Sequence, residues 1–180
     1  MYSIKELYKD IEVLAGILEE NKVDAFRFTA GIEQELIERW ERENVSMLPQ
    51  GYKEFIGLCN GFRYCGTEVF PLERVEVLSA PDEFEGYYCI GTYIGDGSLM
   101  LSDRNGKCYY GDHAFGIKEV EFETFVQDDI LRHIKEVFVD NNMEIPENIY
   151  TRESKKEKPI LSHNRYLEIL EKIKAEKEKE

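Results

Sequence analysis

A chain of 180 residues is long enough to bury a hydrophobic core of its own, and its apolar content of 42% is typical of a globular protein. The 37 acidic and 23 basic residues give a net charge of −14, which disfavours binding to nucleic acid or to an anionic membrane. No apolar run approaches the roughly 20 residues that cross a bilayer, and the N-terminus lacks a signal-peptide core, so we expect a cytoplasmic protein.

The negative charge is concentrated in the first 150 residues. Residues 151–180 contain nine bases and seven acids, so the acidic excess lies entirely upstream of them. Such a field would raise the encounter rate with a basic protein. The alternative is that the charge serves solubility alone.

Helical periodicity predicts two helices at the start of the chain. Ser3 and Glu6 form a capping-box pattern before a first helix that ends near Asn21. A short extended segment, Val23–Phe28, follows it. Thr29 is then the expected N-cap of a second amphipathic helix that includes Trp40.

A third helix is predicted from Pro49 to Asn60. Proline suits the first helical turn, and the pair Asn60-Gly61 suits the helix end because glycine adopts a left-handed conformation easily. The apolar face of this helix contains Tyr52, Phe55, Ile56 and Cys59. We expect Cys59 and Cys89 to be small core residues, and all four cysteines to be reduced thiols.

From Glu68 onward the apolar period becomes that of strands. Asn105-Gly106 between two β-rich runs predicts a hairpin, and Gly95 is expected in a tight turn. Helical spacing returns from Phe122 to Phe138. Residues 144–159 are polar and predict a linker, after which Tyr166 to Ile173 predict a final helix with a narrow apolar stripe. That stripe would pack on its own domain or, alternatively, contact a partner.

The segment Leu48–Phe62 resembles the signature of the SUKH superfamily. It reads Leu-Pro-Gln-Gly-Tyr-Lys-Glu-Phe-Ile-Gly-Leu-Cys-Asn-Gly-Phe, and Val69–Val75 and Ile94–Ser98 are similar to later blocks of the same family pattern. The superfamily includes the Smi/Knr regulators of yeast cell-wall assembly and many bacterial immunity proteins. The motif positions with an expected structural role are Leu48, Pro49, Tyr52, Phe55, Asn60, Gly61, Pro71, Leu72 and Gly95.

The expected fold is α+β. N-terminal helices precede a mostly antiparallel sheet of four to six strands with packed helices, and the resemblance implies the same arrangement. Residues 1–140 are predicted to form this single Smi/Knr-like domain. Residues 141–180 are predicted to form a linker and a C-terminal amphipathic helix.

The residue patterns do not favour an enzyme. His113, His133 and His163 have no metal-ligand spacing, and no nucleophile with a matching base can be defended. The glycines between residues 91 and 97 lack the Lys-Ser/Thr ending of a phosphate-binding loop. We therefore expect no catalytic residue, no metal and no cofactor.

The resemblance implies a protein-binding function, in which a bacterial immunity protein neutralises a cognate toxin, often a nuclease. Tyrosines of the strand region alternate with acidic residues, which suits contact with a basic toxin surface rather than with nucleic acid. The predicted contact residues are Asp82, Glu83, Glu85, Tyr87, Asp96, Asp103, Tyr110 and Asp112. The alternative is a cytoplasmic regulatory scaffold of the cell-wall-assembly type.

Overall fold

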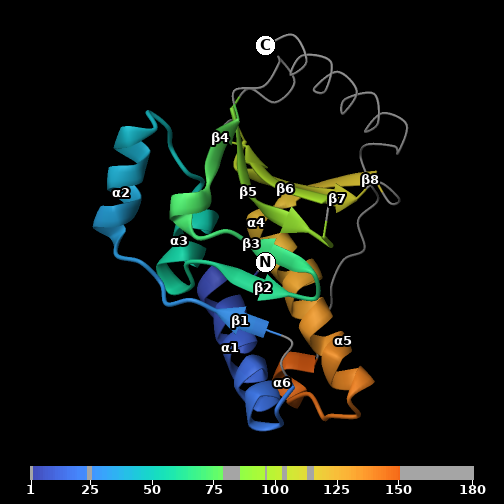
Figure 1. Cartoon of the computed structure of the whole chain (residues 1–180). Helices are drawn as coiled ribbons and strands as arrows, with labels where there is room; N and C mark the ends of the chain where they lie inside the picture. Colours follow the sequence, from blue (N-terminus) through green and yellow to red (C-terminus); the bar gives the residue numbers. More distant parts are fainter. Residues whose placement is uncertain are drawn as a thin grey trace.

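Helices and strands follow one another along the chain as an α+β fold, which confirms the predicted class (Figure 1). The computed structural model describes residues 2–23, 26–78, 86–95, 97–102, 105–112 and 116–150. The helices are α1 (Ile4–Glu20), α2 (Gln34–Glu43), α3 (Gln50–Leu58), α4 (Phe122–Phe125), α5 (Arg132–Asp140) and α6 (Glu147–Tyr150). A π-helical segment, η2 (Val126–Leu131), joins α4 to α5, and a single 3-10 turn, η1 (Leu72–Arg74), lies within the strand region.

The described strands form one antiparallel sheet. They are β1 (Phe26–Phe28), β2 (Phe62–Tyr64), β3 (Thr67–Val69), β4 (Glu76–Leu78), β5 (Tyr87–Tyr93), β6 (Gly97–Ser102), β7 (Lys107–Asp112) and β8 (Gly116–Glu121). Their order is β1-β2-β3-β5-β6-β7-β8, and β4 pairs with β5 beside this path. The sheet has eight strands, more than the four to six expected, because the three-residue strand β2 and the charged strand β8 carry weak sequence signals.

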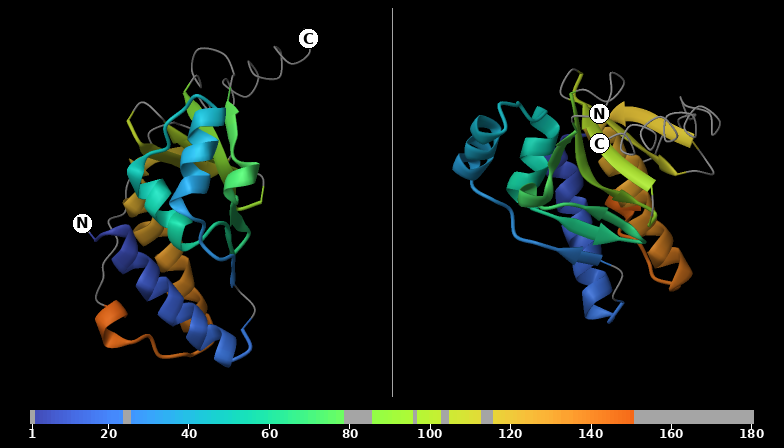
Figure 2. Two further views of the ribbon diagram at one scale, coloured as in Figure 1. Left: turned by 90° about the vertical axis from the view of Figure 1, so that its left-hand side faces the viewer. Right: turned by 45° about the horizontal axis from the view of Figure 1, so that its top comes forward.

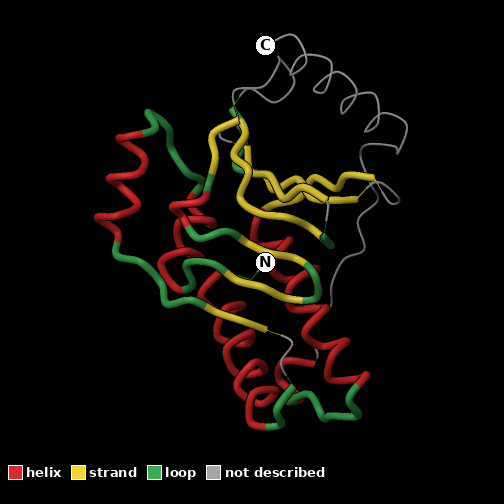
Figure 3. Tube along the Cα trace, viewed as in Figure 1, coloured by secondary structure: helices red, strands yellow, loops and turns green. Residues whose placement is uncertain are grey.

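The helices α1, α3 and α4 to α5 share a core with one face of the sheet. Buried strand residues such as Tyr88 and Leu101 belong to the same hydrophobic cluster as Leu14 of α1 and Phe125 of α4. Figures 1 and 3 show α1 and α5 running below the strands, and α2 lies outermost beside α3 in the views of Figure 2. No helix of the described residues is long and apolar enough to span a membrane.

The first predicted helix and the helix predicted from Phe122 to Phe138 are confirmed. Ser3 caps α1 through the predicted capping box, since its hydroxyl accepts the Glu6 N–H while Glu6 accepts the Ser3 N–H at 2.9 Å. The closing helix spans Phe122 to Asp140 through η2. Its π-helical turn has no counterpart in the sequence pattern.

The second helix begins later than predicted. Thr29 does not cap it; the Thr29 hydroxyl donates to backbone carbonyls of Asn60 and Gly61 instead. The chain between Thr29 and Ile32 runs along the end of α3, where the Ile32 N–H donates to the Ile56 carbonyl at 3.1 Å. These long-range contacts outweigh the local capping preference, and α2 starts at Gln34.

The end of α3 also differs from the prediction. Cys59 already has extended dihedral angles (φ −149°, ψ 102°), so Asn60-Gly61 does not form a left-handed helix cap. The Asn60 Oδ1 atom instead accepts the Leu72 N–H at 2.7 Å, which ties α3 to η1. Cys59 is buried as predicted, and burial raises the pKa of its thiol to about 11.

The remaining motif residues lie in the hydrophobic core, at helix N-caps or in turns. Leu48, Tyr52, Phe55 and Leu72 are buried, and Pro49 and Pro71 are the N-cap residues of α3 and η1. Gly61 and Gly95 have positive φ angles of 109° and 86°, and Gly95 lies in the turn between β5 and β6. The predicted hairpin is formed by β6 and β7, although residues 103–104 of its turn lie outside the described part.

The domain continues beyond the predicted boundary at residue 140. Ile149 of α6 is 1% exposed, and Met143 and Ile145 pack against the core. The predicted linker therefore cannot begin at residue 144. The rest of that linker and the predicted final helix, Tyr166 to Ile173, lie outside the described residues.

Tyr52 supplies a test of this packing. Its ring is fully buried against Phe122, with ring centroids 5.4 Å apart, yet its hydroxyl has no hydrogen-bond partner among the described residues. We expect Tyr52→Phe to leave the free energy of unfolding unchanged or to raise it by about 1 kcal/mol, because an unsatisfied buried hydroxyl is removed. Urea denaturation measures this; a loss above about 1 kcal/mol would show that the hydroxyl has a stabilising partner.

Candidate partner-binding site

Most of the predicted acidic contact residues cannot be placed. Asp82, Glu83, Glu85, Asp96 and Asp103 lie outside the described residues, as does the side chain of Asp112 at the end of β7. Their role in binding therefore stays a prediction. The two predicted tyrosines can be placed, and they differ from each other.

Tyr110 is a core residue, so its prediction as a partner-contact side chain is wrong. It is 3% exposed and packs against Phe125 and Tyr93 with ring centroids 4.9 and 5.1 Å away. Alternation along β7 turns its neighbour Tyr109 to the other face, where Tyr109 meets Tyr87 in an edge-to-face pair at 5.1 Å. Tyr87 is half-buried, so its ring is partly accessible.

A buried carboxylate, Asp129, organises the polar part of the core. The Tyr64 hydroxyl donates to its Oδ2 atom at 2.7 Å, and the Tyr93 hydroxyl donates to its Oδ1 atom at 2.9 Å. The Arg132 guanidinium lies 3.5 Å from Oδ1, and His133 Nδ1 lies 3.6 Å from Oδ2. Asp129 lies within η2 and is 0% exposed, so the π-helical turn delivers this acid to the ends of two strands.

The neighbours of Asp129 keep it ionised. Burial alone would raise the pKa of its carboxyl, but hydrogen bonds from His133 and Tyr64 and the charge of His133 outweigh burial and lower the pKa. Burial would likewise lower the pKa of His133, but the Asp129 carboxylate outweighs this effect and raises it. A carboxylate this enclosed has no exposed oxygen for a substrate, so the network is structural.

The pKa of His133 predicts a pH-dependent stability. Its protonated ring faces Asp129, Arg132 and Glu136, and a pKa raised in the folded state stabilises the protein below the unfolded value of about 6.5. This contribution is lost as the pH rises through the folded pKa. We expect His133→Gln to lower the free energy of unfolding by about 1 kcal/mol more at pH 5.5 than at pH 8.5. Equal losses at both values, measured by urea denaturation, would contradict this assignment.

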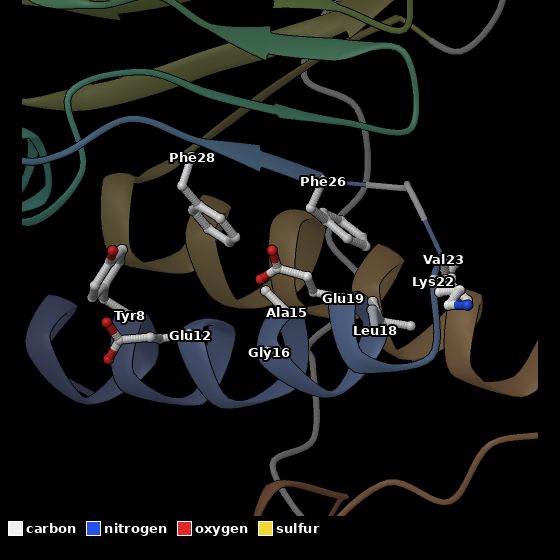
Figure 4. A pocket seen from close by; sticks show the side chains of 10 residues that line it. All are labelled: Tyr8, Glu12, Ala15, Gly16, Leu18, Glu19, Lys22, Val23, Phe26 and Phe28. Carbon is white, nitrogen blue, oxygen red and sulfur yellow. The ribbon is translucent and has the colours of Figure 1, made fainter.

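A groove of about 610 Å³ runs between α1 and β1 (Figure 4). Phe26 and Phe28 point from β1 toward the helix, and Tyr8 closes one end. Glu12 and Glu19 lie on the α1 side and are exposed. Because they are seven residues apart, their Cα atoms are separated by two helical turns, or about 10.5 Å along the axis. Lys22 lines the far end beside Val23.

Small side chains explain why the groove is open. Ala15 and Gly16 face it from the middle of α1, and a Cβ atom built on Gly16 would meet no other atom within 4 Å. Glycine inside a helix costs about 1 kcal/mol relative to alanine. No packing contact requires glycine at this position. Because glycine is disfavoured inside helices, the helical pattern alone could have identified Gly16 as unusual. Glu12, Glu19 and Gly16 are not among the contact residues predicted from the sequence.

The groove is a candidate binding site among the described residues. It combines apolar walls with two accessible carboxylates, which suits a partner with basic side chains. Within the described ranges no three His, Cys, Asp or Glu side chains are grouped to hold a metal ion. Comparisons with protein-family models and with curated proteins found no match for this chain.

Proposed function

We propose that this chain is a non-enzymatic protein-binding domain, an immunity protein that neutralises a toxin with a basic surface. The observation that carries the proposal is the α1/β1 groove, where Glu12 and Glu19 stand beside the aromatic rings of Phe26 and Phe28. Lysine and arginine side chains bury their apolar stems while keeping the charged ends paired or hydrated, so they match such a surface.

The net charge of −14 supports the same proposal. A strongly acidic protein attracts a basic partner over several ångströms, and this long-range attraction raises the association rate more than it slows dissociation. The resemblance of residues 48–62 to the SUKH superfamily supports immunity in particular. A toxin that acts on nucleic acid needs a cationic substrate cleft, and an acidic protein seated on that cleft would block it.

Co-expression tests this function directly. We expect the chain to protect cells from the toxin encoded beside its gene and to co-purify with that toxin. Association should slow by about tenfold between about 0.02 and 0.15 M salt, because exposed charges are screened over a shorter distance. Absence of protection, or an association rate that does not change with salt, would contradict the proposal.

Charge-reversal variants distinguish two candidate surfaces, the α1/β1 groove and the predicted acidic surface of Asp82, Glu83 and Glu85. Glu12→Lys with Glu19→Lys should reduce toxin affinity by about tenfold or more, whereas Glu20→Lys, which is exposed on α1 outside the groove, should have a much smaller effect. Reversal of Asp82, Glu83 and Glu85 should slow association only if the predicted acidic surface also faces the toxin. Unchanged kinetics would remove those three residues from the interface.

A further inference from the structure

The sheet has apolar side chains on the face opposite the core as well as on the core face. The strand register places Cys89 opposite Met100, and Met100 opposite Tyr109. Because side chains alternate along a strand, Tyr87 of β5 and Ile117 of β8 lie on this same face. These five side chains define the outer face of the sheet, which is turned away from α4 and α5 (Figure 1).

Two residues of the outer face are buried although they do not belong to the core. Met100 is 7% exposed and Ile117 is 4% exposed, and among the buried apolar residues of the described part these two alone lie outside the main hydrophobic cluster. Ile117 is in β8, at the end of the strand order, and its neighbour across the ladder is Gly111, which has no side chain to cover it. On a sheet face open to water such a residue would be exposed. Another part of the chain therefore lies over the outer face.

The described helices do not supply this cover. Their buried apolar side chains, from Ile4 of α1 to Ile149 of α6, all belong to the main cluster on the other face. Among the internal segments outside the described ranges, the longest is 79–85, and it has one large apolar residue, Phe84. The C-terminal segment, residues 151–180, is much longer and contains the apolar stripe from Tyr166 to Ile173. It is the part of the chain whose length and sequence pattern suit the outer face.

We propose that residues 161–175 bind the outer face of β5 to β8 as an amphipathic helix, so that the chain carries its own ligand for this surface. Tyr166, Leu170 and Ile173 follow one another at spacings of four and three residues and share one side of a helix. From the first to the last of them the helix rises about 10.5 Å, which is close to the distance of about 9.6 Å from β6 to β8. The stripe therefore has the length to cover both buried residues of the outer face. This inference does not depend on the proposed function.

The connection is long enough for this arrangement. The described chain ends at Tyr150 in α6, beside the lower end of α1 (Figure 1). Residues 151–165 would span about 50 Å when fully extended. A folded domain of this size is about 40 Å across. The segment can therefore cross the molecule from α6 to the outer face.

The charges of the two surfaces are complementary. Residues 151–180 have nine bases and seven acids, so they carry a positive net charge. On the outer face, Lys107 pairs with Glu119 at 3.1 Å, and Glu76 and Glu121 are exposed at its margins. Lysines flank the apolar stripe in the sequence, so they can approach these carboxylates while the stripe covers the apolar residues.

This packing changes which surface is open to a partner. Tyr87, a predicted contact residue, is half-buried at the margin of the outer face, where its ring meets Tyr109. A partner would reach the outer face only by displacing the C-terminal segment, whereas the α1/β1 groove would stay open. The outer face is then a second, closed surface of the free protein.

The native cysteines of the whole chain test the inference. Cys89 is half-buried on the outer face, and burial raises the pKa of its thiol; Cys65 is exposed in the turn between β2 and β3, and Cys59 and Cys108 are buried in the core. We expect iodoacetamide to modify Cys89 about tenfold more slowly than Cys65, because the segment must leave before the reagent reaches the thiol. Mass spectrometry of the digested protein gives each rate. Equal rates for the two cysteines would overturn the inference.

A matched pair of variants assigns the protection to the stripe. Leu170→Asp places a charge within the stripe and should raise the modification rate of Cys89 about tenfold, whereas Ala175→Asp adds the same residue on the polar side of the predicted helix and should leave that rate unchanged. The rate of Cys65 should be the same in both variants, and slow modification of Cys108 checks that the core is intact. An unchanged rate of Cys89 in Leu170→Asp, or an equal rise in both variants, would overturn the inference.

Two measurements on the unmodified sequence complete the test. Backbone amides of residues 166–173 should exchange with deuterium at least about tenfold more slowly in the whole chain than in a peptide of the same sequence. Equal exchange rates would overturn the inference. Protection of Cys89 should also be the same in dilute and in concentrated protein, since the segment belongs to the same chain. Protection that is lost on dilution would assign the cover to a second copy and would overturn the inference as well.

Discussion

Replacing Asp129 with alanine is expected to lower the free energy of unfolding by about 3–5 kcal/mol. The substitution removes the acceptor of two buried tyrosine hydroxyls, those of Tyr64 and Tyr93, and leaves Arg132 and His133 without the carboxylate that they face. Breaking a buried charge network from one side leaves the remaining polar groups desolvated and unpaired, which costs more than the net gain of forming it. Urea denaturation at pH 7 measures the loss.

Smaller changes in the same network separate charge from hydrogen bonding. Tyr64→Phe removes one donor and should cost about 1–2 kcal/mol, while Asp129→Asn keeps the shape and loses the charge, so it should fall between Tyr64→Phe and Asp129→Ala. Asp140→Ala, at an exposed position near the end of the same helix, is the control and should stay within about 0.5 kcal/mol of the wild type. A loss below about 1 kcal/mol for Asp129→Ala would show that the network is not important for stability.

The stabilisation that Asp129 provides depends on pH, and the pKa of its carboxyl gives the direction of that dependence. The pKa of Asp129 is lower in the folded protein, so its contribution to stability is present above the unfolded value of about 4 and is lost as the pH falls through the folded pKa. The difference in stability between the wild type and Asp129→Asn should therefore be largest near pH 5 to 6, where His133 is also protonated. It should shrink toward pH 3.

Features set within one helix were predictable from the sequence. The α1 capping box involves residues three apart, and the buried face of α3 follows from spacings of three and four residues, so both could be read locally. The α+β class followed from the change of apolar period near Glu68. These signals survive because the tertiary contacts of both helices agree with their local preferences.

Features set by distant contacts were not predictable in this way. Threonine is a favoured N-cap residue, but the Thr29 hydroxyl donates to backbone carbonyls about 30 residues away along the chain. Asp129 lies four residues after Phe125 and three after Val126, on the apolar side of the predicted helix, and this position was a readable sign of a buried acid. Its tyrosine partners, however, come from two strands and could not be identified from spacing.

In the candidate site, too, the features that depend on tertiary structure could not be predicted from the sequence. Tyr110 could have been separated from Tyr109 only with the orientation of β7 known, because alternation predicts that one of them is buried without saying which. The groove depends on how α1 lies against an edge strand whose position in the sheet has no local signal. Glu12 and Glu19 therefore look like ordinary solvent-facing helix residues in the sequence.

Gly31→Ala is expected to lower the free energy of unfolding by about 2–4 kcal/mol, through steric overlap and lost hydrogen bonds. A Cβ atom at Gly31 would lie 2.1 Å from the carbonyl oxygen of Gly57 and 2.8 Å from the carbonyl carbon of Leu58, which are backbone atoms of α3. The segment would have to move away. That movement would weaken the bond from the Ile32 N–H to the Ile56 carbonyl and the bond from the Asn60 N–H to the Ala30 carbonyl.

Gly57 is the matched control, because it is the other partner in this close contact. A Cβ atom there would approach no atom closer than the Ile32 carbonyl oxygen at 4.0 Å, and the residue is helical and exposed. Gly57→Ala should therefore be neutral or stabilise the fold by up to about 1 kcal/mol, through helix propensity. Opposite signs for two glycines that face each other would show that the backbone approach of residues 29–32 fixes the end of α3. Equal and small effects of the two substitutions would mean that this segment can move without cost.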